Sequence, residues 1–212
     1  GSGADAGVDE DTADIEEVSK TMVAVATSIV FSREVDGVSE GFDLDQTVSD
    51  NTDRTSCNHP DYVTPDGEEG IDNQMAELVP LIEQFGGAAL EALVEDAIIE
   101  GDLRLGFEVT GVDDFENDSD VTLSIYRLLG APYVGTDEKL QPWQTFDIDA
   151  ESPWSRVENA AIVDGVLTAG PFDILLPIYV FNFEFFINLI DGYVRIEISE
   201  DGPAAALVGG AV

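Results

Sequence analysis

Residues 161–198, AIVDGVLTAGPFDILLPIYVFNFEFFINLIDGYVRIEI, decide the fold class of this chain. Within residues 171–190 apolar and polar side chains alternate; the apolar odd positions are Tyr179, Phe181, Phe183, Phe185, Ile187 and Leu189, and Asn182, Glu184 and Asn188 take even positions. A period of two indicates a β-strand. Asp164-Gly165 and Asp191-Gly192 each separate two apolar runs, and Asp-Gly is favoured in type I′ turns. We therefore predict a hairpin at each pair.

The same run is the only segment that resembles a membrane span. A helix there would bury Asp173, Pro177 and Glu184 in the hydrocarbon at a cost of several kcal/mol. We therefore predict no membrane-spanning segment.

The residues from 102 onward also alternate. Leu103, Leu105, Phe107 and Val109 form one apolar face, and Val121, Leu123 and Ile125 form another. The acidic segment 113–120 joins these two strands, so we predict a hairpin here as well. Val194, Ile196 and Ile198 mark the last clear strand. Short strands with turn signals every ten or so residues are typical of a sandwich or a jelly roll. We expect an α+β, mainly β fold: an antiparallel β sandwich or jelly-roll-like arrangement with two short helices and an acidic loop region near the N-terminus.

The N-terminal part supplies those helices. Residues 21–37 are rich in β-branched side chains, and this composition predicts a strand that ends at Asp36-Gly37. Apolar residues at helical spacing predict a helix over 75–85, capped by Asp72 or Asn73 and interrupted by Pro80, and a second over 88–100 that stops at Gly101. Residues 1–19 predict a solvated acidic tether. Residues 20–212 then form a single domain, in which 20–101 holds the first strand, the acidic loop and the helices, and 102–212 the antiparallel β region.

The charge balance excludes two classes of partner. The chain has 45 acidic and 8 basic residues, for a net charge of −37. This field repels nucleic acids and anionic membrane surfaces, because both are bound through lysine and arginine. Three uses of the acids remain: solubility at high salt, binding of multivalent cations and attraction of a basic protein. Clustering of the acids at 5–17, 43–72 and 113–120 favours cation binding for some of them.

The segment 41–73 is the strongest candidate for a metal site. Ca²⁺ takes six to eight oxygen ligands, and this segment is rich in carboxylates. The spacing does not match an EF-hand loop. The alternative is that these residues only cap turns. The predicted ligands of Ca²⁺, which would hold the loop in shape without taking part in catalysis, are Asp43, Asp45, Asp50, Asp53, Asp66 and Asp72. For a second metal they are Asp114, Asp118 and Asp120, although a solvated hairpin tip explains these acids equally well.

No catalytic constellation stands out. Cys57 and His59 are the only cysteine and histidine, which is too few for a zinc site, and no GxSxG motif accompanies the histidine. Two suitably spaced carboxylates could hydrolyse glycosides, but the sequence does not nominate a pair. Tyr133, Trp143 and Trp154 could stack on sugar rings, or they could be half-buried packing residues. The phenylalanine stripe of residues 181, 183 and 185 is expected to pack in the core.

The segments GFDLDQTVSDNTDRTSC and PDGEEGIDNQ, which start at Gly41 and Pro65, resemble a group of uncharacterised secreted or lipoprotein-like bacterial sequences. The resemblance implies export and a shared architecture, and it carries no activity. The chain's location is then expected to be secreted, or periplasmic or on the outer cell envelope, with lipid anchoring open. We expect a calcium-stabilised binding or structural protein of the cell surface. The alternatives are a carbohydrate-binding or carbohydrate-active module, and an acidic subunit of a surface assembly that docks a basic protein.

Overall fold

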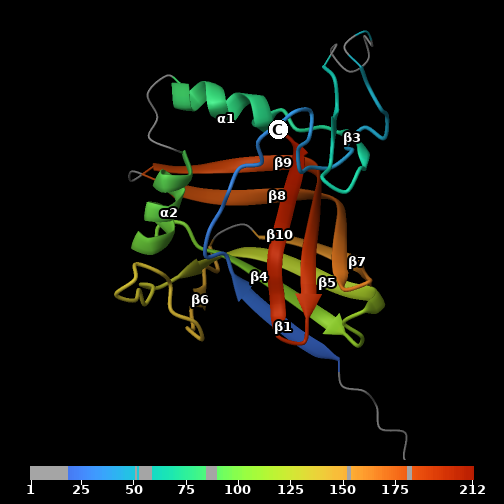
Figure 1. Cartoon of the computed structure of the whole chain (residues 1–212). Helices are drawn as coiled ribbons and strands as arrows, with labels where there is room; N and C mark the ends of the chain where they lie inside the picture. Colours follow the sequence, from blue (N-terminus) through green and yellow to red (C-terminus); the bar gives the residue numbers. More distant parts are fainter. Residues whose placement is uncertain (1–18, 51, 53–58, 85–89, 152–153, 181–182) are drawn as a thin grey trace, which may run out of the picture.

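The computed structural model describes residues 19–50, 52, 59–84, 90–151, 154–180 and 183–212. It consists of one large curled antiparallel sheet, a two-stranded sheet and two helices (Figure 1). The elements in chain order are β1 (Lys20–Val25), β2 (Tyr62–Val63), β3 (Glu69–Ile71), α1 (Met75–Gln84), α2 (Leu90–Glu100), β4 (Leu105–Val112), β5 (Asn117–Leu129), β6 (Asp147–Ile148), β7 (Ser155–Val163), β8 (Val166–Val180), β9 (Phe183–Ser199) and β10 (Gly202–Ala211).

The large sheet has the strand order β1-β4-β5-β7-β8-β9-β10, with β6 paired to β5. Every neighbouring pair is antiparallel, and the strands follow one another along the sheet in chain order. The predicted α+β, mainly β, sandwich-like class is confirmed, and the connections are those of a meander. The predicted tether, except its last residue, lies outside the described residues.

Two of the predicted hairpins form. The strands β4 and β5 pair from Leu105 opposite Arg127 to Thr110 opposite Thr122. The strands β7 and β8 meet at Asp164-Gly165, whose φ angles of 51° and 78° are those of a type I′ turn. Since both turn residues need a positive φ, the Asp-Gly pair explains the position of this turn.

The hairpin predicted at Asp191-Gly192 is wrong, because this pair lies inside the continuous strand β9. Asp191 does have a positive φ of 48°, but it lies in an irregular stretch of the β8–β9 ladder and not in a turn. The register of this ladder shifts on both sides of the pair formed by Phe172 and Gly192. A Cβ on Gly192 would lie 2.7 Å from Cδ1 of Ile174, so the glycine permits close strand packing. The single strand predicted over 171–190 is instead divided between β8 and β9.

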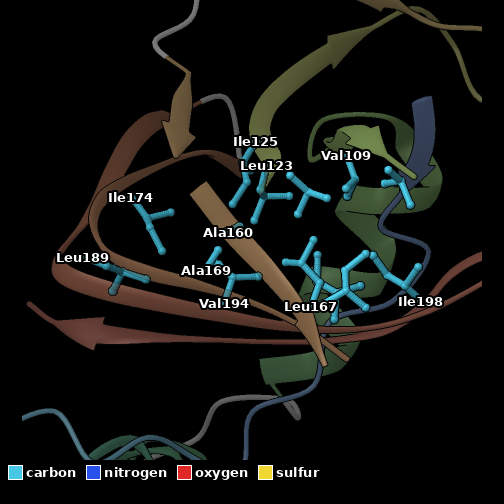
Figure 2. Packing of buried hydrophobic residues seen from close by; sticks show 14 residues of the cluster. Val109, Leu123, Ile125, Ala160, Leu167, Ala169, Ile174, Leu189, Val194 and Ile198 are labelled. Atoms are coloured by element: carbon cyan, nitrogen blue, oxygen red, sulfur yellow. The ribbon is translucent and has the colours of Figure 1, made fainter. Parts of the chain in front are cut away.

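The curl of the sheet encloses one aliphatic core. Figure 2 shows its side chains pointing into the space between the strands. In β5, Val121, Leu123 and Ile125 are all buried, as the period of two predicts. The core as a whole consists of Val109, Val112, Val121, Leu123, Ile125, Ala160, Ile162, Leu167, Ala169, Ile174, Leu189, Val194, Ile196 and Ile198. The side chains of the predicted phenylalanine stripe lie outside the described part of the structure.

The first predicted strand is shorter than expected. It ends at Val25, which pairs with Gly106 of β4. The next residue, Ala26, still donates its amide to the carbonyl of Leu105, but β4 begins there and offers no further partner. The turn at Asp36-Gly37 is present, with positive φ at both residues and a bridge between Val35 and Val38.

Both helices form where the sequence predicts them. Asn73 caps α1 by accepting a 3.2 Å hydrogen bond from the amide of Ala76, and the helix continues through Pro80. Arg33 joins the two helices through Glu83 of α1 at 2.8 Å and a two-pronged contact with Glu91 of α2 at 2.5 and 2.8 Å. This guanidinium lowers the pKa of Glu91 to about 2, chiefly through its hydrogen bonds. None of the helices described here is long and apolar enough to cross a membrane.

Candidate metal centre

A second layer packs on the end of the sheet near the C-terminus (Figure 1). We call residues 35–50 and 59–73 the acidic layer, because they contain ten carboxylates and no lysine or arginine. Its main contact with the sheet is Phe42, which is buried against Gly209 and stacks on Tyr193 at a centroid distance of 5.7 Å. Arg195 of β9 lies over the Phe42 ring and reaches Glu68 at 3.4 Å. These contacts fix the acidic layer on β9 and β10.

Three carboxylates converge inside this layer. Asp43, Asp45 and Asp72 each offer one oxygen, and these oxygens all lie within 4.8 Å of one another. No other group of three or more His, Cys, Asp or Glu side chains with this spacing occurs in the part of the chain that the structure describes. Oxygen atoms at such a separation can share one cation. The cluster could therefore hold a metal ion.

Backbone contacts of Asp72 bring the cluster together. The Asp72 amide donates to the carbonyl of Phe42 at 3.0 Å. In return, Oδ2 of Asp72 accepts hydrogen bonds from the amides of Leu44 at 2.8 Å and Asp45 at 3.3 Å. This exchange pins segment 42–45 against the residue that follows β3. Asp45 is held in turn, because its Oδ1 accepts from the amide and hydroxyl of Thr47 at 2.9 and 2.7 Å.

Asp43 differs from its two neighbours. Its Oδ1 is buried and has no hydrogen-bond partner. A buried oxygen without a partner carries the full desolvation cost of a polar atom. A cation bound to Oδ1 of Asp43 would offset this cost. The side chain leans over Gly70, whose φ is +86°, and a Cβ there would lie 3.0 Å from Oδ2 of Asp43 and 3.1 Å from the carbonyl oxygen of Thr47. Gly70 thus leaves room for the carboxylate.

The surroundings of Asp72 disfavour its negative charge. Burial is the largest cause that raises the pKa of Asp72, and the charge of Asp45 adds to it. The hydrogen bond from the Leu44 amide acts in the opposite direction, and it does not reverse the shift. A cation bound beside Asp72 would favour the ionised carboxylate and so oppose this rise in pKa.

Only part of the predicted ligand set meets here. The cluster contains Asp43, Asp45 and Asp72, although 27 positions separate Asp45 from Asp72 in the sequence. Asp50 instead turns its Oδ1 to the amide and hydroxyl of Thr52. Asp66 is exposed in the turn between β2 and β3, outside the cluster. Asp53 lies outside the described residues. Gly70 also shapes the site without having been predicted, and its only signal in the sequence was a glycine next to acidic residues in a short strand.

The second acidic loop is a set of turn caps. Oδ2 of Asp118 accepts the amides of Asp113 and Asp114, Oδ1 of Asp118 accepts the amide of Asp120, and Oδ1 of Asp114 accepts the amide of Glu116. Although burial opposes it, these amides lower the pKa of Asp118. The predicted second metal set of Asp114, Asp118 and Asp120 does not converge on a common point, and the carboxylates of Asp114 and Asp118 are used by backbone amides instead.

Among the described residues, the histidine contacts one glutamate and the indoles lie at the surface. His59 lies 3.7 Å from Glu77, and its Nδ1 is buried without a partner; Cys57 lies outside the described residues. Trp143 and Trp154 are 97% and 58% exposed, so the half-buried packing interpretation is wrong for Trp143.

Comparison of this chain with models of known protein families, with curated proteins and with solved structures finds no match. The functional conclusion rests on the residues themselves.

Proposed function

We propose that Asp43, Asp45 and Asp72 bind one Ca²⁺ ion, which holds the acidic layer in place on a binding or structural protein exported to the cell envelope. The observation that carries the proposal is the convergence of three carboxylates around a buried Asp43 oxygen that has no partner. Burial of such an oxygen is costly unless a cation or a donor meets it.

The chemistry of the ligands favours calcium over other metals. The cluster offers oxygen only, which excludes the sulfur and nitrogen sets that zinc and copper prefer. Ca²⁺ accepts irregular geometry and completes its six to eight ligands with main-chain carbonyls and water. Asp45 is exposed, so water has access to the site. Three carboxylates on a partly exposed loop match the weak, sub-millimolar to millimolar sites of extracellular modules.

The ion would act on the structure and not on a substrate. Asp43 and Asp45 belong to the segment that carries Phe42, whereas Asp72 follows β3. One cation would therefore link two segments of the chain that otherwise meet through a few hydrogen bonds. An ion that binds only the native state stabilises it by mass action, by about 2.7 kcal/mol at a hundredfold excess over Kd. The proposed role is a calcium-dependent docking of the acidic layer.

The test is a thermal melt in EDTA, in Mg²⁺ and in Ca²⁺ at equal ionic strength. We expect Ca²⁺ to raise the Tm of the wild-type chain by several degrees above the value in Mg²⁺, because the site needs a large oxygen-rich coordination shell. Asp43→Asn should lose this difference. Asp66→Asn removes the same charge from an exposed position of the same layer, and this variant should keep the difference in Tm between Ca²⁺ and Mg²⁺. Equal melts in Ca²⁺ and EDTA, or an equal calcium response in both variants, would contradict the proposal.

A second candidate function is carbohydrate binding at the loop that carries Trp143. Its indole is 97% exposed, Tyr133 is 76% exposed, and the loop is braced by Gln144, whose side chain contacts the backbone of Tyr133 and Gln141. Exposed rings on a braced loop can stack on sugar faces. Screening on a glycan array should then detect a ligand that Trp143→Ala loses and Trp154→Ala retains, and an array without any binding glycan would rule the candidate out.

A further inference from the structure

A pocket of about 650 Å³ lies at the end of the sheet where three turns meet. Its walls come from the β4–β5 turn at 113–116, the β7–β8 turn at 164–165, and residues 198–200, which end β9 and begin its turn into β10, with Lys20 at the start of β1. The turns are linked to one another, because the Gly165 amide donates to the carbonyl of Glu116 at 3.1 Å and the Ile198 amide to the carbonyl of Gly165 at 2.8 Å. We call this the turn pocket.

The turn pocket is strongly acidic. Five carboxylates line it against one ammonium. Asp114 caps its own turn, but within the described residues the other four side chains accept no hydrogen bond and form no ion pair; these are Asp113, Glu116, Asp164 and Glu200. Their charges are thus free to attract a cation.

The chain's own cation already occupies this position. The ammonium of Lys20 lies over the ring of Phe115, 4.2 Å from its centroid, which is a cation–π contact. No carboxylate among the described residues forms an ion pair with Lys20, so the aromatic face, and not a carboxylate, positions the ammonium. Phe115 in turn packs against the aliphatic core, which fixes the ring. The geometry is that of a receptor for an organic cation.

We propose that the turn pocket docks an arginine or lysine side chain of a basic partner protein, which displaces Lys20 from Phe115. A metal ion fits less well, because no three of the pocket carboxylates come within ligand distance of one another and a phenyl ring offers no ligand. An arginine suits the pocket best, since a guanidinium stacks on an aromatic ring and also pairs with carboxylates.

This inference is independent of the calcium site. The two lie at opposite ends of β10, because Glu200, two residues before the start of that strand, lines the turn pocket, while Gly209, near its end, contacts Phe42 of the acidic layer. Each can therefore fail without the other.

The first test measures binding of a fluorescein-labelled hexa-arginine peptide by anisotropy, in EDTA and at physiological salt. Because the whole chain is acidic, the control must remove equal charge elsewhere. The pocket variant is Asp113→Asn, Glu116→Gln and Glu200→Gln; the control variant is Glu95→Gln, Glu151→Gln and Asp173→Asn, three exposed positions outside the pocket. We expect the pocket variant to weaken binding about tenfold or more and the control by about twofold, as local pairing exceeds a screened field. Equal weakening would overturn the proposal.

The second test removes the internal competitor. Lys20→Gln should bind the peptide several-fold more tightly than the wild-type chain, whereas Lys139→Gln, which removes an exposed lysine elsewhere, should change affinity much less. Phe115→Leu keeps an apolar side chain against the core and should weaken binding, because it lacks the aromatic face. If Lys20→Gln and Lys139→Gln behave alike, only the diffuse field of the chain attracts the peptide.

Discussion

The curled sheet and the acidic layer are parts of one chain that are held together in different ways. In the sheet, fourteen buried aliphatic and alanine side chains form one cluster between the strands. The apolar cluster at the acidic layer has only three members, which are Tyr62 and Ile71 of the layer and Ala76 of α1. The layer relies instead on carboxylates that accept backbone amides, such as Asp72 with Leu44 and Asp61 with Ser49.

This difference predicts different sensitivities. Burial of apolar surface depends little on pH or on ions. Hydrogen bonds to carboxylates depend on the protonation of those carboxylates and on any cation they share. The sheet should therefore set the overall stability, and the acidic layer should set how that stability responds to solution conditions.

The largest expected effect is in the sheet. Leu123→Ala removes a fully buried side chain from the middle of β5 and should cost about 2–5 kcal/mol, because the rigid core cannot fill the cavity. Urea denaturation measures the loss. Leu129→Ala is the matched control, since this exposed leucine ends the same strand. A loss at Leu123 no larger than that at Leu129 would mean that the cluster does not carry the stability.

A smaller effect separates the two regions through their glycines. Gly70 and Gly165 both have positive φ, so alanine at either should cost about 1 kcal/mol. At Gly70 the new Cβ would also lie 3.0 Å from Oδ2 of Asp43, whereas at Gly165 the nearest atom is 3.5 Å away. Gly70→Ala should therefore also reduce the calcium-dependent rise in Tm, and Gly165→Ala should leave it intact. Thermal melts in EDTA and Ca²⁺ provide both quantities, and an unchanged calcium response in Gly70→Ala would count against the cluster as the site.

The smallest effect is the pH dependence of the acidic layer. The pKa of Asp72 is raised in the folded chain, so the folded state holds its proton more tightly than the unfolded state. In EDTA, stability relative to Asp72→Asn should thus fall as the pH rises from the unfolded pKa through the folded one. Denaturation of both variants across this range measures the difference. Ca²⁺ should reverse the slope, because the ion binds the ionised carboxylate and so lowers its pKa in the folded state. A difference that grows with pH in EDTA would show the opposite sign of the shift.

Local patterns explain how much of the fold the sequence could predict. The alternation in β5, the Asn73 cap and the Asp164-Gly165 turn each depend on a few adjacent residues, and all three form as expected. Asp191-Gly192 has the same local signal, but its surroundings decide the outcome, because neighbouring strands need close approach there. Local preference sets the φ angle, and the sheet decides whether the chain reverses.

The candidate site was less predictable for a related reason. Composition identified the acidic segment, but it could not tell converging carboxylates from those that cap turns. Asp50 and Asp72 both accept backbone amides, and they differ in whether those amides are local or from a distant segment. That distinction depends on how residues 42–45 meet the end of β3, which no periodicity encodes.

The seat of Phe42 on Gly209 and Tyr193 also sets an order of events during synthesis. The ribosome makes Phe42 151 residues before Tyr193 (193 − 42) and 167 residues before Gly209 (209 − 42), which at 5–20 residues per second is a delay on the order of ten seconds. For that time the segment has no surface on which to dock. Its carboxylates repel one another and keep the segment soluble. This repulsion, which the folded acidic layer has to overcome, thus protects the unfinished chain from aggregation.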